Sequence, residues 1–260
     1  MERYLILSLV IFLAGCAGDI SPGPQSLDEA LSQTFRSFES ESEDLSVGAE
    51  VIAGVLADVD LTSNDLEDRS FSVEALIEED LADVPHPDRS PDAAPGIVVA
   101  RRSDFALDAH VGLQQMADQT PIEPGSPDHY DRTFTEGEAC FADDGCAALR
   151  TTNDVTKKNL LMEVSYTFDK DFRWVETEAG TAMVARSWLP ESVWGSGGSI
   201  LQAYTVEVWI PDGDGTVRMI SLWNETELTS VSVSDDLEMT FTRAGMDDVL
   251  RAADDWLAEQ

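Results

Sequence analysis

The sequence predicts an α+β fold, in which N-terminal helices precede an antiparallel β-meander that a C-terminal helix covers. Apolar residues recur every three or four positions over residues 27–59, which is the spacing of one helix face. From about residue 130 the spacing changes to two, as in Met162–Phe168. Helical spacing returns from Met246 to Leu257. Sequential hairpins make an antiparallel sheet, and the terminal helix needs an apolar face of that sheet to cover.

Residues 26–84 are expected to form a helical N-terminal region. Ser26 and Glu29 have the spacing of a capping box, in which two side chains satisfy free backbone N–H groups at the start of a helix. Two stretches of helical spacing follow. The acidic run 39–44 between them is compatible with a polar helix face or with a break.

A third helix is expected from Ser72 to Pro85, because apolar residues keep helical spacing up to a residue that stops helices. Prolines are concentrated in residues 85–96, which therefore predict a linker. The sheet and its covering helix are expected over residues 97–260, beginning with a short buried strand at 97–100.

Within this second region, a helix over residues 105–116 is expected to precede the meander. Two long strands, 200–210 and 217–223, are joined by the turn sequence 211–215, which is a strong hairpin signal. The glycine- and serine-rich stretch 195–199 predicts a mobile loop. The other expected strands are 162–168, a segment from 172 after a turn at 169–171, 181–188, and further strand at 231–241.

The C-terminal helix is expected to be amphipathic, with one apolar face and one charged face. The apolar face is expected to lie on the sheet and the charged face in water. The apolar residues are Met246, Val249, Leu250, Ala253, Trp256 and Leu257, and the charged residues are Asp247, Asp248, Arg251, Asp254 and Asp255.

This order of elements across residues 97–260 resembles the helix-grip fold of START-like lipid-binding domains. In that family a long C-terminal helix closes a curved sheet over a cavity. The resemblance is one of element order and involves no shared motif, so it assigns no binding residue in this chain.

The start of the chain has the features of a secretory signal peptide. Arg3 precedes the apolar run 5–12, and Leu13-Ala14-Gly15-Cys16 follows it. The apolar run is too short to span a bilayer. Cys16 can therefore have a specific role in this signal, or the segment is an ordinary signal peptide that happens to contain a cysteine.

The sequence around Cys16 resembles the lipobox of bacterial lipoproteins. The resemblance implies that the signal peptide, residues 1–15, is removed and that the Cys16 thiol carries a diacylglycerol with acyl chains such as palmitate. By the same resemblance, Ala17 and Gly18, with no Asp directly after Cys16, imply an anchor in the outer membrane of the bacterial cell envelope. Residues 16–25 would then be a flexible tether between lipid and fold.

The composition excludes one class of partner. Asp and Glu number 51 and Lys and Arg 16, which gives a net charge of −35. Such a surface repels nucleic acid and anionic headgroups. Because the acids are spread along the chain, the charge indicates solubility or a saline habitat in preference to one cation site.

Two cysteines remain beside Cys16, and an exported protein usually joins such a pair. Cys140 and Cys146 enclose a short polar segment with a turn-forming Asp-Gly. Their spacing is not that of a metal or redox CxxC motif. A structural Cys140–Cys146 disulfide is therefore expected.

No residue pattern indicates catalysis, a metal or a cofactor. His86, His110 and His129 are far apart in the sequence and belong to no ligand motif. Asp212–Gly215 lacks the further ligands of a calcium loop and reads equally well as a hairpin turn. Gly195–Ser199 matches neither a nucleophile elbow nor a phosphate-binding loop.

Several aromatic residues fall in the expected strands. They are typical core residues of a sheet, although they could also line a cavity or a flat carbohydrate-binding face. They are Trp174, Trp188, Tyr204, Trp209 and Trp223.

The sequence therefore favours a lipid-anchored envelope protein whose domain is a non-enzymatic module that binds an apolar small ligand or an envelope partner. The alternatives are an envelope hydrolase with an unrecognised site and a purely structural envelope protein. An apolar pocket between the sheet and residues 243–259 would favour the ligand-binding module.

Overall fold

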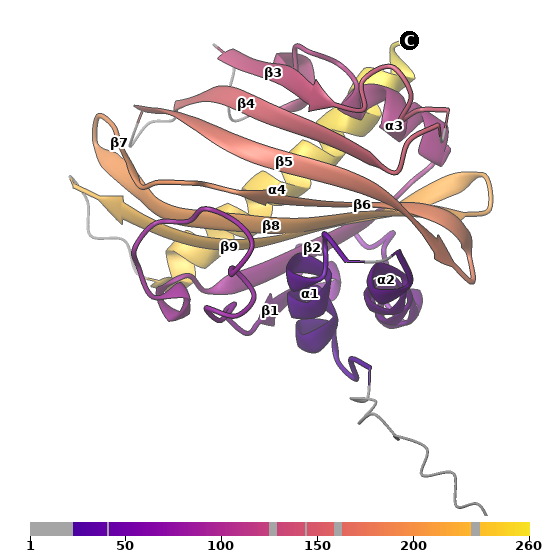
Figure 1. Cartoon of the computed structure of the whole chain (residues 1–260). Helices are drawn as coiled ribbons and strands as arrows, with labels where there is room; N and C mark the ends of the chain where they lie inside the picture. Colours follow the sequence, from indigo (N-terminus) through magenta and orange to yellow (C-terminus); the bar gives the residue numbers. More distant parts are fainter. Residues whose placement is uncertain (1–22, 41, 125–128, 144, 159–162, 230–234) are drawn as a thin grey trace, which may run out of the picture.

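The computed structural model describes residues 23–40, 42–124, 129–143, 145–158, 163–229 and 235–260 (Figure 1). The α-helices are α1 (Leu27–Arg36), α2 (Ser42–Ala57), α3 (Leu107–Gln114) and α4 (Asp235–Ala258). The strands are β1 (Ser70–Val73), β2 (Gly96–Ser103), β3 (His129–Glu136), β4 (Ala148–Lys158), β5 (Glu163–Thr177), β6 (Gly180–Trp188), β7 (Val193–Trp194), β8 (Gly198–Asp212) and β9 (Gly215–Leu228).

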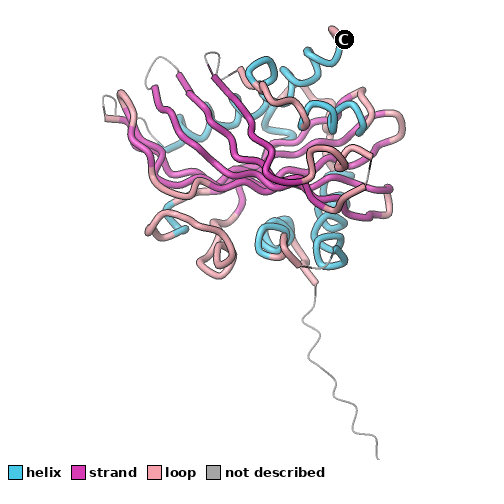
Figure 2. The backbone as a smooth tube through the Cα atoms, turned by 45° about the horizontal axis from the view of Figure 1, so that its top comes forward, coloured by secondary structure: helices cyan, strands magenta, loops and turns pink. Residues whose placement is uncertain are grey.

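The strands form one antiparallel sheet in the order β1-β2-β9-β8-β6-β5-β4-β3, with β7 paired to the edge of β8. The sheet is the middle of three layers. Figure 2 shows α1 and α2 on one side of it and α3 and α4 on the other. The predicted α+β class, with an antiparallel sheet covered by a C-terminal helix, is therefore confirmed.

The first face of the sheet and the N-terminal helices share one hydrophobic core. Phe35 of α1 and Ile52 of α2 are fully buried in the same cluster as Tyr204 and Trp223 of the sheet. The Phe35 and Tyr204 rings pack in a T-shaped, edge-to-face arrangement, with their centroids 6.0 Å apart. Residues 30–61 therefore supply part of the hydrophobic core on this face of the sheet.

The expected capping box begins α1 with one change of partner. Ser26 Oγ accepts a hydrogen bond of 3.2 Å from the backbone N–H of Glu29, as the spacing predicts. The Glu29 carboxylate accepts from the N–H of Gln25, 2.6 Å away. The acidic run 39–44 contains a break, because α1 ends at Arg36 and α2 begins at Ser42.

The prediction of a helix from Ser72 to Pro85 is wrong. Residues 70–73 form the edge strand β1, and residues 74–84 then run through turns. Leu76 and Leu81 are nevertheless buried in the core. Their helical spacing reflects side chains that return to the same core from an irregular backbone.

The prediction of a turn at residues 169–171 is also wrong, because strand β5 continues through these residues without interruption. A charged triplet in a sequence usually marks an exposed turn. Here Lys170 and Asp171 are both buried. The Asp171 carboxylate lies 3.5 Å from Arg150 and 3.9 Å from Arg186, so opposite charges partly compensate its burial.

Two other expected elements differ from the structure. The strand expected at 231–241 is wrong for residues 237–241, which belong to α4, whereas Val231 and Val233 lie outside the described residues. The loop expected to be mobile at 195–199 is the end of a hairpin. The N–H of Gly195 donates to the carbonyl of Gly198 at 2.9 Å, and Gly197 has φ 86°.

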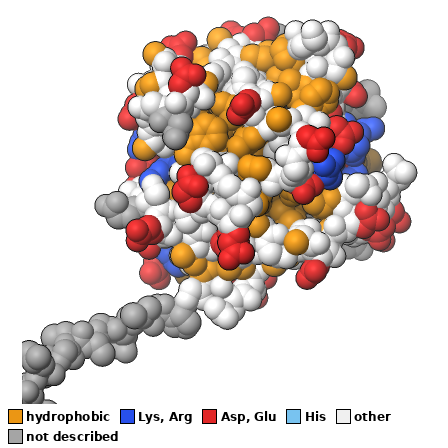
Figure 3. Space-filling view, turned by 90° about the vertical axis from the view of Figure 1, so that its right-hand side faces the viewer, with side chains coloured by type: hydrophobic (Ala, Val, Ile, Leu, Met, Phe, Trp, Pro, Cys, Tyr) orange, Lys and Arg blue, Asp and Glu red, His pale blue; other side chains and the backbone are white. Residues whose placement is uncertain are grey.

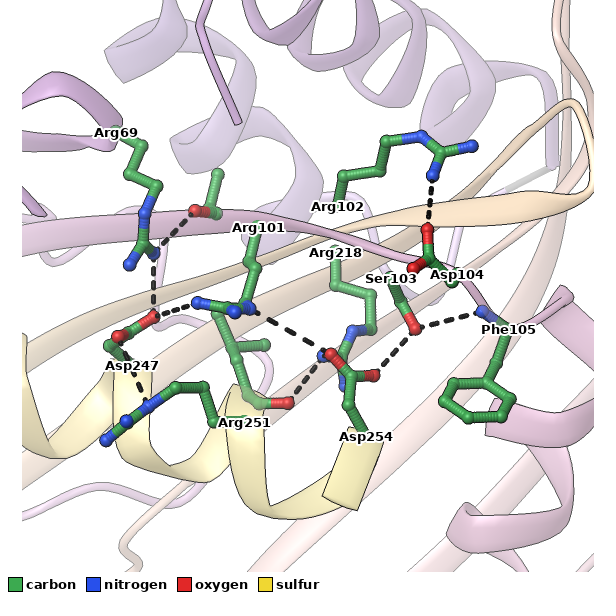
Figure 4. Close-up of polar contacts among 12 residues, drawn as sticks. Arg69, Arg101, Arg102, Ser103, Asp104, Phe105, Arg218, Asp247, Arg251 and Asp254 are labelled. Atoms are coloured by element: carbon green, nitrogen blue, oxygen red, sulfur yellow. Dashed lines mark hydrogen bonds and ion pairs between the residues drawn. The ribbon is translucent and has the colours of Figure 1, made fainter. Parts of the chain in front are cut away.

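Helix α4 crosses the second face of the sheet. Met246 and Leu250 pack on Ile97 and Val99 of β2, as the amphipathic pattern predicts. The prediction that all the charged residues lie on the wet side is wrong. Asp247 and Asp254 point toward the sheet, where they pair with arginines (Figure 4).

Cys140 and Cys146 form the expected disulfide in the segment between β3 and β4. Cys16 and the expected signal peptide lie outside the described residues. Within the described residues, no helix combines the length and the hydropathy needed to cross a bilayer. Figure 3 shows Asp and Glu side chains scattered over one end of the molecule, whereas Lys and Arg form a few small groups.

Candidate functional site

A cavity of about 470 Å³ lies between α4 and the second face of the sheet. Helix α4 contributes Thr242, Gly245, Met246 and Val249 to its wall. The opposite wall comes from strands β3–β6, β8 and β9, and the 3₁₀ turn Thr120–Ile122 closes one side. This is the pocket on which the ligand-binding prediction depends.

Most of the cavity wall is apolar. The strands twist and present alternate side chains to this face, so a long stretch of sheet supplies the lining. The apolar and aromatic lining residues of the described chain are Ile122, Pro124, Tyr130, Val155, Tyr166, Phe168, Trp188, Leu189, Ala203, Ile220, Leu222, Met246 and Val249.

A buried ion pair interrupts this apolar wall. Lys170 Nζ of β5 lies 2.6 Å from Glu207 Oε1 of β8, and the two side chains are 8% and 13% exposed. Burial lowers the pKa of Lys170, and the adjacent Glu207 carboxylate opposes that shift. The pair therefore places full charges in contact with the interior of the cavity.

A second ion pair lies at a more exposed part of the wall. Lys157 Nζ is 3.5 Å from Glu123 Oε1, and the Lys157 side chain is 40% exposed. Burial raises the pKa of Tyr130 to about 12 and also raises the pKa of Tyr166. Both phenols thus stay protonated at neutral pH and can donate hydrogen bonds into the cavity.

Arg132 of β3 is the remaining cation of the lining and is 4% exposed. Its Nε donates to Asn153 Oδ1 at 2.9 Å, and its Nη1 donates to the backbone carbonyl of Gln114. The guanidinium carbon lies 5.4 Å from the centroid of the Phe172 ring. Among the described residues, no carboxylate lies within ion-pair distance of Arg132.

Ion pairs hold the C-terminal half of α4 against the sheet (Figure 4). Asp247 lies 2.7 Å from Arg69 and 3.5 Å from Arg101. Asp254 lies 2.9 Å from Arg218, whose guanidinium also donates to the carbonyl of Leu250 at 2.5 Å. These contacts fix the helix beside the cavity, so the sheet and α4 form a defined wall on both sides.

Ser103, His110 and Asp254 are adjacent, but they are not arranged as a catalytic triad. Ser103 Oγ donates to Asp254 Oδ1 at 2.6 Å and lies 3.0 Å from His110 Nε2. Because the hydroxyl proton goes to Asp254, the histidine donates to Ser103 and cannot deprotonate it. Burial, followed by the nearby Arg218, lowers the pKa of His110 to about 3. The hydroxyl is therefore not activated as a nucleophile.

The structure does not bring the other histidines to this site. His129 lies 3.7 Å from Asp131 on β3, and His86 Nδ1 lies 3.0 Å from the Pro87 carbonyl. In the part of the chain that the structure describes, no three His, Cys, Asp or Glu side chains are grouped to hold a metal. Asp212–Gly215 forms the tight β8–β9 turn, with φ 64° at Gly213.

The aromatic residues expected in the strands serve mainly as core. Tyr204 and Trp223 are buried under α1 and α2, and Trp209 packs near Phe172. Trp188 also lines the cavity.

The charged cavity-lining residues that the sequence left unassigned are Arg132, Lys170 and Glu207, together with Glu123 and Lys157. One signal in the sequence distinguishes the two lysines. Lysine occurs only at positions 157, 158 and 170, and two of these three line the cavity.

No protein-family model and no curated protein sequence matches this chain. Solved structures with a similar arrangement include a STAR-related lipid transfer protein from Xanthomonas axonopodis, with 12% identity, a TM-score of 0.44, and coverage of 64% of this chain and 87% of the other. A protein from Thermus thermophilus gives 14% identity, a TM-score of 0.44, and coverage of 64% and 98%. Human StAR-related lipid transfer protein 5 gives 8% identity, a TM-score of 0.43, and coverage of 64% and 76%.

Proposed function

We propose that this chain is a lipid-anchored protein of the bacterial cell envelope whose domain binds a small amphipathic molecule in the cavity under α4. The cavity carries this proposal. Its volume, about 470 Å³, lies in the range of small-molecule sites, and its wall combines a large apolar area with a few charged groups. The domain acts as a binding module, since Ser103 and His110 are not arranged for nucleophilic attack.

A neutral fluorescent probe tests binding in this cavity. N-phenyl-1-naphthylamine is expected to become bright on the protein and to compete with dodecanol. Ala203 lines the cavity, so Ala203→Phe fills it and is expected to weaken probe binding at least about tenfold. Ala244 is exposed on α4 and provides the matched control Ala244→Phe. Equal probe binding by the two variants and wild type would exclude this cavity as the site.

The anchor is supported by the Leu-Ala-Gly-Cys sequence behind the apolar run 5–12. Metabolic labelling with an alkyne analogue of palmitate is expected to mark the wild-type protein and not Cys16→Ala. The labelled protein is expected in the outer-membrane fraction. Equal labelling of both proteins would exclude Cys16 as the attachment site.

A further inference from the structure

We propose, building on the ligand-binding function proposed above, that the ligand of this cavity is a monoanionic amphiphile whose acidic head binds Arg132 and Lys170. The remainder of the molecule would lie along the apolar wall between the sheet and α4. This assignment names the chemical class of the ligand and the two side chains that select it.

The charged groups of the cavity wall leave one cation without an acidic partner. Two of its three cations are compensated, since Lys170 pairs with Glu207 and Lys157 with Glu123. Asp248 also reaches the wall, but its side chain is 48% exposed and pairs with Arg251 on the outside of α4. The interior therefore retains the positive charge of Arg132.

This excess charge is exceptional in this molecule. The chain as a whole carries −35, and each of the other three buried arginines of the described residues, Arg69, Arg186 and Arg218, meets an acid. Arg69 pairs with Asp247, for example, and Arg218 with Asp254. Burial of an uncompensated charge is unfavourable unless a partner arrives. An anion in the cavity would supply that partner.

Arg132 keeps hydrogen-bond donors for a ligand. Arg132 donates Nε–H to Asn153 Oδ1 and Nη1–H to the Gln114 carbonyl, and its guanidinium also interacts with the Tyr130 hydroxyl on the cavity wall. A guanidinium carries five N–H donors, so these contacts leave at least one donor for a ligand. Because Arg132 lines the cavity, a ligand in the cavity can reach its guanidinium.

Lys170 and this guanidinium both lie near the Phe172 ring. Lys170 Nζ is 5.1 Å from the centroid of the Phe172 ring, and Arg132 Cζ is 5.4 Å from the same centroid. Proximity of the two cations helps to lower the pKa of Lys170, after burial. The ammonium has three N–H donors, of which one binds Glu207. A carboxylate, sulfate or phosphate monoester oxygen placed here would accept from both side chains.

The charges of the cavity disfavour a cationic head group. The acids of the interior, Glu123 and Glu207, are each already bound by a lysine. A cationic head would have to displace a lysine and would meet Arg132. An uncharged head group neither repels Arg132 nor neutralises its charge. The expected order of affinity is therefore acid, then alcohol, then amine.

The test compares three amphiphiles that share one chain. Dodecanoic acid, 1-dodecanol and dodecylamine are used at pH 8, below their micellar concentrations, to displace N-phenyl-1-naphthylamine from the wild-type protein. A hydrogen bond to a charged group adds enough affinity that the acid is expected to displace the probe at a concentration at least about tenfold lower than the alcohol. The amine is expected to be weaker than the alcohol.

Three variants locate the preference. Arg132→Gln removes the charge and is expected to bring the acid and alcohol to within about twofold of each other. Arg132→Lys keeps the charge and is expected to retain the preference. Arg102 pairs with Asp212 on the outer surface, so Arg102→Gln is the matched control and should behave as wild type. Probe binding by each variant shows that its cavity is intact.

The outcomes separate the two proposals. A wild-type protein that binds neither the probe nor any amphiphile overturns the ligand-binding function itself. A protein that binds the probe but shows equal displacement by acid and alcohol retains that function and overturns the anion assignment. An acid preference that survives in Arg132→Gln with an intact cavity also overturns the role of Arg132.

Discussion

Lys170 and Glu207 reach toward each other across β6 and join β5 to β8, with 2.6 Å between Nζ and Oε1. Strand β6 separates their strands in the sheet, so the side chains span the floor of the cavity. A buried pair of this kind contributes little net stability when both partners are present, but removing one partner leaves an uncompensated charge.

The Lys170–Glu207 pair predicts a strong coupling between two substitutions. Glu207→Gln alone is expected to lower the free energy of unfolding by about 3–5 kcal/mol, because Lys170 is left charged and buried. Lys170→Met combined with Glu207→Gln is expected to recover most of that loss. Urea unfolding of the wild type, both single variants and the double variant measures the coupling. Additive losses in the double variant would contradict the pairing.

Asp171 predicts a dependence of stability on pH. Burial raises the pKa of Asp171 from 3.8 to about 6, and Arg150 and Arg186 only partly oppose the shift. The folded protein therefore holds this proton more tightly than the unfolded chain does. The favourable contribution is complete below pH 3.8 and is lost as the pH rises through about 6.

Asp171→Asn isolates that contribution, because the amide does not titrate. The variant is expected to gain stability relative to wild type between about pH 4 and pH 6, by about 3 kcal/mol for a shift of two pH units. Urea midpoints at several pH values measure the difference. Asp255 is exposed on α4, so Asp255→Asn is the control and should show no such trend. A constant difference between Asp171→Asn and wild type would refute the raised pKa.

His110 is expected to stay neutral in the folded protein. Burial lowers its pKa to about 3, and Arg218 contributes to the shift. Stability from the neutral ring is present above pH 6.5 and is lost as the pH falls toward 3. Histidine ring signals in NMR spectra should therefore show His110 unchanged from pH 8 to pH 5, whereas in urea it should titrate near about 6.5. A folded-state midpoint above pH 5 would be inconsistent with the buried contact to Ser103.

The packing of α4 predicts a contrast between adjacent residues. Trp256 is partly buried against Leu113 and Ile122, whereas Asp255 is exposed. Full burial of an aromatic ring makes truncation cost about 3–5 kcal/mol, so Trp256→Ala is expected to cost somewhat less, about 2–3 kcal/mol. Asp255→Ala is expected to stay within about 0.5 kcal/mol of wild type. Equal thermal midpoints for the two variants would show that this end of α4 does not pack on α3 and the 3₁₀ turn Thr120–Ile122.

Much of the fold could be predicted because local signals agreed with it. The Ser26 cap, the hairpin turn at Gly213 and the apolar face of α4 are each encoded within a few neighbouring residues. The errors arose where tertiary contacts decide the outcome. Leu76 and Leu81 are buried without being helical, and Lys170 and Asp171 are buried because partners from other strands partly compensate their charges.

The cavity was expected from element order, but its polar groups were not. Arg132, Lys170 and Glu207 come from β3, β5 and β8, and only the register of the sheet brings them together. Each looks like an ordinary charged residue in its own segment. Asp254 was likewise assigned to the wet face of α4, because nothing near it in the sequence reveals Arg218 on β9.

The central claim is that the cavity between α4 and the sheet binds an amphiphile. A crystal structure of the protein with dodecanoate tests it most directly. The account predicts one alkyl chain between Val249 of α4 and Ile220 of β9, with its carboxylate within hydrogen-bond distance of Arg132. A cavity that holds only water at saturating dodecanoate, or a ligand bound elsewhere on the molecule, would contradict the account.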